Sequence, residues 1–257
     1  MKLISSIILF FVIILSNAQE VKNKYPFRSG EKIDYDVRYS IGFFWFTAGF
    51  VTFNVDSLEY KNQSAYHFVS VGSTYPGYDW IFKVRDRYES IVTCNNLRSL
   101  YFTKKTFEGG YEVDNTYVFD YDKKQINYRI NNSNINKKTG KLDWEHQIRD
   151  VLASAYYLRT LDMKNLVPGA KIPLNTVLDA EYFPLYVRYL GKIKIENLDG
   201  KIYDCLKFSA KVVGGSIFKE GENLEVWVTN DKRKIPIKIQ AEILVGQVKV
   251  YMTDYTP

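Results

Sequence analysis

The sequence predicts a mainly β protein, a large curved antiparallel sheet of about twelve strands that forms a barrel or half-barrel with one central α-helix. Three observations predict this class. Apolar and polar residues alternate with a period of two along most of the chain, and short polar turns separate the alternating segments. One segment between residues 143 and 166 carries apolar residues at helical spacing instead.

The N-terminal residues 1–18 have the layout of a secretory signal peptide. Lys2 supplies a positive start, Leu3–Leu15 is apolar apart from two serines, and Ser16–Ala18 is a small-residue cleavage site. The apolar run is shorter than the roughly 20 residues of a membrane-spanning helix, and a retained anchor is the alternative. We therefore expect cleavage after Ala18, a periplasmic or secreted protein without a transmembrane segment, and a single β domain over residues 19–257.

Strands are expected wherever the alternation is clear, as in Ile33–Tyr39, where apolar or aromatic residues alternate with charged ones. The expected strands cover residues 31–40, 46–57, 64–73, 80–94, 97–108, 111–121, 125–130, 172–180, 185–197, 201–213, 222–230, 234–240 and 243–253. Most neighbouring strands are joined by short turns, which favours antiparallel pairing because parallel pairs need a long crossover. Asp199-Gly200, between two β-branched runs, is typical of a hairpin.

Residues 143–166 are expected to be the helix. Ile148, Leu152 and Tyr156 recur at helical spacing, Asp143 is placed to cap the start, and Pro168-Gly169 stops the helix. The polar residues 131–142 before it are expected to form a loop. A lone helix must bury its apolar side, and the concave face or open end of a curved sheet is the expected place.

So many strands are expected to wrap around an interior. Beyond about ten strands, a twisted open sheet tends to curl or split. It also leaves exposed edges that invite aggregation. Larger barrels leave an interior that side chains do not fill, so this interior is a candidate cavity for an apolar ligand.

The sequence carries no recognisable catalytic, metal or nucleotide motif. The two histidines, His67 and His146, are far apart, and HExxH, CxxC, GxSxG, Walker and GxGxxG motifs are absent, so we expect no metal and no cofactor. The net charge is +6, but acidic and basic residues are interleaved, so nucleic-acid binding is not expected. A hydrolase with acids or a cysteine in a cleft is a third hypothesis for the function.

The two cysteines allow two interpretations. Cys94 and Cys205 lie in strand-like segments, and an oxidising compartment permits a disulfide between them. Such a bridge closes a long loop and stabilises by roughly 4 kcal/mol in the chain-entropy model. Two buried free thiols are the alternative, and the sequence leaves both open.

Residues 80–89 are the most unusual cluster. On a strand, Trp80, Phe82 and Asp86 face one side and Arg85 faces the other. A buried acid on an apolar face needs a partner, and Arg159 of the expected helix is a candidate. Asp86 is then a polar anchor in the cavity, part of a structural ion pair, or an exposed residue at a strand end. The candidate ligand-binding residues are Trp45, Trp80, Phe82, Arg85, Asp86, Tyr156 and Arg159.

Two corners of the expected sheet are rich in aromatic residues. They are Phe43–Phe46 and Thr74–Trp80. Such corners form either an apolar rim that meets lipid or a protein partner, or the core at a barrel end.

Several short stretches, in this order and spacing, resemble the DUF3108 family of bacterial envelope proteins, a domain of unknown function. They are Phe27–Tyr35, Thr47–Gly49, Val84–Glu89, Asp150–Arg159, Val226–Asp231 and Ile235–Ile237. The resemblance implies exported antiparallel β proteins whose barrel-like sheet is similar in outline to lipoprotein and lipid carriers of the envelope. It implies no established reaction, so no catalytic residues are assigned.

Our first hypothesis is therefore a non-enzymatic periplasmic or envelope protein that binds or carries an apolar, lipid-like ligand in a β-barrel cavity. The alternative is an envelope scaffold or assembly factor that acts through protein–protein contacts. The sheet edges favour this alternative, because an edge strand can accept a strand from another protein.

Overall fold

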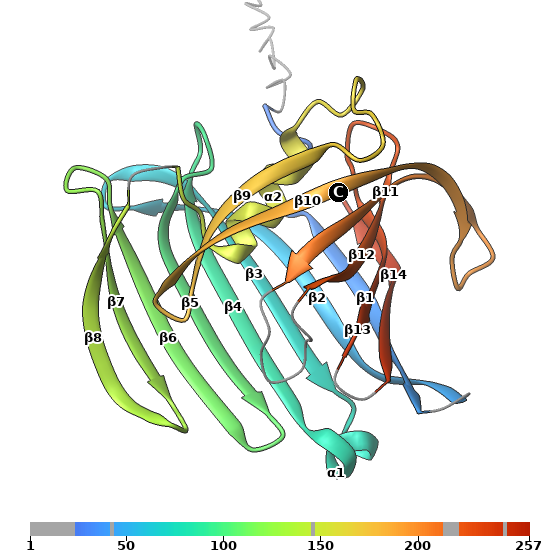
Figure 1. The fold of residues 1–257 in the computed structure, drawn as a ribbon, viewed down its shortest axis with the longest axis horizontal. Coiled ribbons are helices and arrows are strands. Elements are labelled where there is room, and N and C mark those ends of the chain that lie inside the picture. Colours follow the sequence, from blue (N-terminus) through green and yellow to red (C-terminus); the bar gives the residue numbers. More distant parts are fainter. Residues whose placement is uncertain (1–23, 42–43, 145–146, 213–220, 244–245) are drawn as a thin grey trace, which may run out of the picture.

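The computed structural model describes residues 24–41, 44–144, 147–212, 221–243 and 246–257. Its strands form one antiparallel sheet of fourteen (Figure 1). They are β1 (Lys32–Ile41), β2 (Phe44–Tyr60), β3 (Gln63–Thr74), β4 (Val84–Thr93), β5 (Ser99–Glu108), β6 (Tyr111–Asp120), β7 (Gln125–Asn132), β8 (Ile135–Asp143), β9 (Lys171–Leu178), β10 (Glu181–Glu196), β11 (Ile202–Val212), β12 (Gly221–Thr229), β13 (Pro236–Glu242) and β14 (Gln247–Thr256). The helices are a 3-10 turn, η1 (Pro76–Tyr78), the short α1 (Asp79–Phe82) and α2 (Val151–Thr160). The expected signal peptide lies outside the described residues.

The sheet follows the chain around a ring that stays open at one point. Each strand pairs with the next in sequence except β8 with β9, and β1 also pairs with β14. The two free edges are therefore β8 and β9, and the segment that joins them contains α2 (Figure 1). This arrangement confirms the predicted mainly β, curved antiparallel sheet, in a form that does not close into a full barrel.

The prediction of a loop at residues 131–142 was wrong, because most of this segment is β8. β8 pairs with β7 from Asp143, opposite Gln125, to Ile135, opposite Asn132. The side chains on both faces of β8 are mostly exposed. An edge strand that is solvated on both faces has no apolar alternation, so the period-two signal is missing there.

α2 is shorter than predicted and begins at a different cap. Asp150, rather than Asp143, is its N-cap and accepts a hydrogen bond from the Ala153 N–H. The residue before the cap, Arg149, donates its N–H to the Asn175 carbonyl and accepts from the Val177 N–H. These backbone bonds to β9 keep the chain extended up to Asp150, so the helix starts only at Val151.

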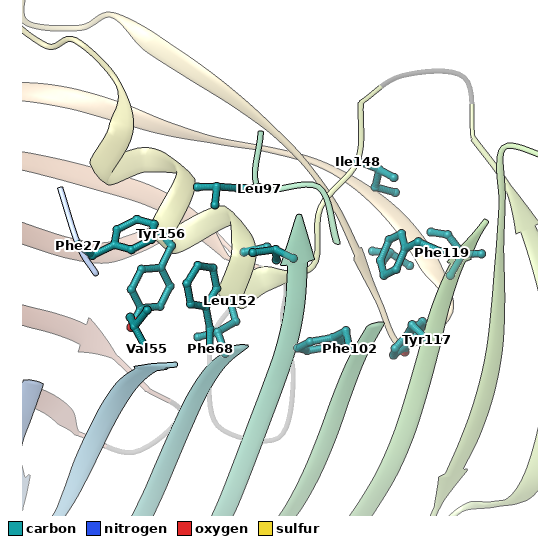
Figure 2. Packing of buried hydrophobic residues seen from close by; sticks show 14 residues of the cluster. Phe27, Val55, Phe68, Leu97, Phe102, Tyr117, Phe119, Ile148, Leu152 and Tyr156 are labelled. Atoms are coloured by element: carbon teal, nitrogen blue, oxygen red, sulfur yellow. The ribbon is translucent and has the colours of Figure 1, made fainter. Parts of the chain in front are cut away.

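The main hydrophobic cluster forms where α2 crosses the sheet. We call the face that packs against α2 the inner face. On it, Tyr156 of α2 stacks on Phe68 with ring centroids 3.9 Å apart, and Phe27 meets Tyr156 edge-on (Figure 2). The buried members of the cluster are Phe27, Val55, Phe68, Val92, Leu97, Phe102, Tyr117, Phe119, Ile126, Ile148, Leu152, Ala153, Tyr156 and Val177. The α2 side of the interior is therefore filled with side chains.

Two smaller clusters support the other half of the sheet. One contains Ile33, Tyr35, Cys205, Trp227, Ile235, Ile237 and Met252. The other contains Val187, Tyr189, Leu206, Phe208 and Val228. The first joins β1 to β11, β12, β13 and β14, so it links strands from the two ends of the chain.

The β9–β10 hairpin joins the opposite walls of the sheet through its tip. Asp179 accepts a hydrogen bond from Asn115 Nδ2 at 2.9 Å and forms an ion pair with Lys104 at 3.3 Å. The Ala180 N–H donates to the Tyr117 hydroxyl at 3.2 Å. Side chains of β5 and β6 thus hold the tip, although β8 and β9 share no ladder.

Candidate functional site

The candidate site lies on the inner face, on the side of α2 toward α1. Gly72, Asp86, Thr106 and Val113 are register partners across β3 to β6. Partners in neighbouring strands point to the same side, and side chains along a strand alternate. This row therefore shares the inner face with Phe68, whose side chain packs against α2.

Two carboxyl groups meet in this row. The side chains of Asp86 and Glu108 lie close enough to form a hydrogen bond when one of them carries a proton. Burial, and then the negative charge of Glu108, raise the pKa of Asp86 to about 7, against the opposing effects of the Phe107 N–H and of Lys104. The Oδ1 atom of Asp86 is buried and has no hydrogen-bond partner among the described residues. Near neutral pH this carboxyl group can therefore serve as a neutral hydrogen-bond donor.

Tyr88 and Lys104 extend the polar group on the inner face. They are register partners, one step further along β4 and β5. Burial raises the pKa of Tyr88 above its usual value, and the charges of Asp86, Glu108 and Asp179 raise it further. Lys104 faces Asp179, so the group combines a cation, a phenol and carboxyl groups.

The arrangement offers polar anchoring but no evident metal chemistry. Among the residues that the structure describes, no three His, Cys, Asp or Glu side chains converge as metal ligands. His67 contacts Glu89 at 2.9 Å, and His146 lies outside the described residues.

Two depressions that the structure describes lie on the opposite, outer face. The larger has a volume of about 780 Å³, and the smaller about 420 Å³. Phe50, Ser73, Arg85, Phe107 and Glu112 line the larger one as successive register partners, so they face away from α2. The inner-face row also borders this depression, through Gly72, Asp86, Thr106 and Val113. A cavity on the inner face, as the sequence suggested, stays a prediction.

Three of the predicted site residues lie at the end of the sheet where α1 is found. Trp80 belongs to α1, and 82% of its surface is exposed. Phe82 packs against the β5–β6 turn, where a Cβ atom on Gly109 would overlap its ring. Trp45 is half-buried beneath Lys249, whose Nζ lies 4.0 Å from the ring centroid. The expected strand over residues 80–94 begins only at Val84, so Trp80 and Phe82 do not share a strand face with Asp86.

Arg85 and Asp86 face opposite sides of β4, as expected, but the suggested pairing of Asp86 with Arg159 is wrong. Arg159 forms two hydrogen bonds with Glu31, at 2.6 and 2.9 Å, in a fully buried ion pair. Tyr156 packs in the main hydrophobic cluster, and its hydroxyl has no hydrogen-bond partner among the described residues. Asp86 is thus the member of the predicted set that reaches the inner-face site.

Sequence reasoning missed Glu108, Lys104 and Asp179. Two of them could have been found from the sequence, because Lys104 and Glu108 lie on the same face of β5 as the apolar Phe102. Charged residues in the inward set of a strand indicate either an exposed end or a polar site. No local pattern links Asp179 to β5, since that contact depends on how the β9–β10 hairpin lies.

Both cysteines are free thiols in the structure, Cys205 buried and Cys94 half-buried, and a disulfide between them stays a prediction. Burial raises the pKa of Cys94, and burial with the nearby Asp204 and Asp231 raises that of Cys205 to about 11. Neither thiol has the lowered pKa of an activated nucleophile. They supply no argument for cysteine chemistry.

A search of the described residues for helices that could span a bilayer found none of sufficient length and hydropathy. A search of curated proteins found no match. The crystal structure of a β-barrel-like protein of the domain of unknown function DUF1849, from Brucella abortus, is similar in fold. Its TM-score is 0.52 at 10% sequence identity, and the alignment covers 88% of this chain and 96% of that one. At this identity the similarity concerns the fold alone.

The family comparison agrees with the resemblance seen in the sequence. The model of DUF3108, described as a protein of unknown function, matches residues 34–253, which include nearly all of the sheet and α2. The match thus covers the candidate site and both free edges. On this coverage, the chain belongs to the DUF3108 family.

Proposed function

We propose that the protein is a non-enzymatic protein of the bacterial cell envelope that binds an apolar, lipid-like molecule on the inner face of its sheet. The observation that carries the proposal is the neighbouring carboxyl groups of Asp86 and Glu108, with a buried Asp86 oxygen that has no hydrogen-bond partner among the described residues. The expected signal peptide in residues 1–18 supports an exported location.

The surroundings of the pair suit a mainly apolar ligand with one polar group. Val51, Gly72 and Val113 lie in the same inner-face row as Asp86. A protonated Asp86 can donate a hydrogen bond to an ester or hydroxyl oxygen of such a ligand. Binding sites of this kind combine apolar walls with a few polar groups that fix orientation.

The geometry of the pair argues against glycosidase chemistry. Retaining and inverting glycosidases hold their two carboxyl groups at least about 5 Å apart, so that the sugar, with or without a water, fits between them. Asp86 and Glu108 lie within hydrogen-bond reach of each other instead. A shared proton between two carboxyl groups suits binding better than attack on a glycosidic bond.

Gly72 provides a direct test of the binding proposal. A Cβ atom there would meet only the Val51 Cγ2 at 3.5 Å and the Asp86 Cβ at 3.8 Å, so an alanine fits and a larger side chain would occupy the space beside Asp86. Ser73→Leu is the matched control, because Ser73 lies next in β3 and faces outward. Native mass spectrometry after incubation with a bacterial phospholipid extract is the measurement.

We expect lipid adducts on the wild type and on Ser73→Leu, and at least a ten-fold loss of adducts on Gly72→Leu. Thermal unfolding confirms that each variant is folded. Equal adducts on both variants, or bare protein in every sample, would contradict the proposal.

The free edge of β8 favours a second candidate, an envelope scaffold. β8 pairs with β7 on one side and has no strand on the other among the described residues. Its unpaired backbone groups can accept a strand from a partner. A photo-crosslinker at Lys141 on β8 should then capture one envelope protein that a crosslinker at Lys61, in the β2–β3 turn, does not capture. Identical products from both positions would count against this candidate.

A further inference from the structure

The tip of the β9–β10 hairpin places a carboxylate between two side chains of other strands. Lys104 Nζ lies 3.3 Å from Asp179 Oδ1 and 3.4 Å from Asp179 Oδ2, and Asn115 Nδ2 donates to Oδ1 at 2.9 Å. We call Lys104 and Asn115 the carboxylate seat. Figure 1 shows the hairpin crossing the sheet, with its tip beside β5.

The carboxylate seat has the features of a formed site for an anionic group. Asn115 is fully buried, and its Oδ1 accepts the Asn131 N–H at 3.2 Å, which turns the amide nitrogen toward Asp179. The Lys104 side chain is 15% exposed, and Asp179 is its ion-pair partner among the described residues. A cation and a fixed amide donor that converge on one carboxylate suit a carboxylate or phosphate group.

The carboxylate seat lies beside the site proposed for the lipid. Lys104 and Asn115 are register partners on the inner face, two residues along β5 and β6 from Thr106 and Val113 of the row that contains Asp86. Two strand residues span about 7 Å. The head group of a lipid whose chain follows that row would therefore meet the carboxylate seat.

The tip that fills the carboxylate seat is strained and has little support from the sheet. Asp179 and Ala180 form a two-residue turn in which both φ angles are positive, at 48° and 60°. Alanine has no side-chain group that offsets the cost of this left-handed conformation. β10 pairs with β11 only from Val187 onward, so the end of the hairpin is a two-stranded ribbon. The turn can therefore leave the seat while the rest of the hairpin stays paired.

We propose that Asp179 occupies the head-group subsite of the inner-face site, and that the anionic head group of a lipid, a phosphate or a carboxylate, displaces it. This inference rests on the proposed function and adds the class of head group. Exchange of one anion for another keeps Lys104 paired, whereas a neutral group would leave its charge without a partner. An anion added without displacement would face the carboxyl groups of Asp86, Glu108 and Asp179 together.

Isothermal titration at pH 6 with two matched single-chain lipids tests the proposal. Oleoyl lysophosphatidic acid carries a phosphate, and monooleoylglycerol is the same molecule without it. We expect the wild type to bind lysophosphatidic acid at least five-fold more tightly than monooleoylglycerol. Oleate, which carries a carboxylate, should also bind more tightly than monooleoylglycerol.

Three variants separate the roles of the charged residues. Asp179→Asn keeps a residue that tolerates the left-handed turn but removes the competing charge, so it should bind lysophosphatidic acid at least five-fold more tightly than the wild type. Its affinity for monooleoylglycerol should stay within two-fold. Lys104→Met should bind both lipids equally. The control Glu181→Gln, which removes an exposed carboxyl group two residues from Asp179, should change neither affinity by more than two-fold.

Hydrogen exchange of the wild type gives a second test that needs no variant. Lysophosphatidic acid should accelerate exchange of the Ala180 amide, because displacement of Asp179 breaks the hydrogen bond from this amide to the Tyr117 hydroxyl. Monooleoylglycerol should leave the exchange unchanged.

Equal binding of the two lipids by the wild type, no gain of affinity in Asp179→Asn, or unchanged or slower exchange at Ala180 would overturn the proposal. Inorganic phosphate that binds as tightly as lysophosphatidic acid would overturn the assignment to a lipid. If both lipids bind equally and Gly72→Leu weakens both, only this inference fails. If neither lipid binds, the proposed function fails with it.

Discussion

Asp86 illustrates, at the scale of the residue, how the fold changes the chemistry of one side chain. Its position on the apolar face of β4 was evident from the sequence, as was its need for a partner. The identity of the partner was not, because both Glu108 and Arg159 are distant in sequence and only the register of β4 with β5 selects Glu108. Burial, together with a carboxyl partner in place of an arginine, raises the pKa of Asp86 instead of lowering it.

The raised pKa predicts a dependence of stability on pH. The pKa of Asp86 is about 7 in the folded protein, against about 4 for an unfolded aspartate, so between these values the folded state binds more protons. The free energy of unfolding should therefore decrease as pH rises from about 4 to 7, at a rate of up to about 1.4 kcal/mol for each pH unit. Asp86→Asn should flatten this decrease and stabilise the protein at pH 8.

Urea unfolding of Asp86→Asn and the wild type at several pH values between 5 and 8 measures the effect. Asp122→Asn, in the exposed β6–β7 turn, is the control. Parallel pH profiles for Asp86→Asn and the wild type would show that burial of Asp86 has no energetic consequence.

The Glu31–Arg159 ion pair makes a second prediction at this scale. Glu31 is 1% exposed, so Arg159→Met leaves a buried charge without its partner. Loss of one partner of a buried pair costs about 3–5 kcal/mol, whereas replacement of both by apolar residues is often neutral. We expect Arg159→Met to be strongly destabilised in urea unfolding and Glu31→Leu/Arg159→Met to recover most of the loss. A double variant as unstable as the single one would contradict this interpretation.

At the scale of the element, the spacing of apolar residues predicted those strands and helices that depend on residues close together in the chain. Most strands were found from period-two alternation, and α2 was found from its apolar spacing. The start of α2 was missed because Arg149 forms backbone hydrogen bonds with β9, which follows the helix in sequence. β8 was missed because an edge strand with both faces in water needs no apolar residues. The sequence predicts a strand in place of α1 because four residues are too few to show helical spacing.

The cap of α2 provides a prediction with its own control. Asp150 is fully buried and accepts hydrogen bonds from Ser90, Ser99 and the Ala153 N–H, so Asp150→Ala removes the cap and leaves two buried hydroxyl protons without an acceptor. Loss of a cap costs about 1 kcal/mol and each unpaired buried group about 1–3 kcal/mol. We expect a loss of about 3 kcal/mol or more in urea unfolding.

Asp143→Ala is the matched control, because Asp143 is the cap that the sequence suggested. In the part of the chain that the structure describes, its side chain accepts a hydrogen bond only from Gln125, at the surface, so its substitution should change stability by less than about 0.5 kcal/mol. An equal effect of the two substitutions would mean that Asp150 does not anchor the helix.

At the scale of the whole molecule, the number of strands predicted curvature but not closure. Closure depends on whether β8 and β9 can meet, and no local pattern contains that information. In the structure, side chains of β5 and β6 hold the tip of the β9–β10 hairpin through Asp179. The candidate site was only partly predictable for the same reason, since Asp86 is apparent in the sequence while Lys104, Glu108 and Asp179 meet it through the sheet.

Asp179→Ala tests how the two walls are joined. The substitution removes the contacts to Lys104 and Asn115, so the β9–β10 hairpin should exchange its backbone amide hydrogens faster. Strands β12 to β14, which take no part in that contact, are the internal control. Hydrogen exchange that accelerates equally throughout the sheet, or in no part of it, would contradict a local role for the tip.

The central claim is that the inner face beside Asp86 receives an apolar molecule. A crystal structure of the protein loaded with bacterial phospholipid at pH 6 tests it most directly. We predict elongated ligand density along Val51, Gly72 and Val113, with a polar group within hydrogen-bond distance of Asp86. An inner face filled there by the side chains of the protein alone would contradict the claim.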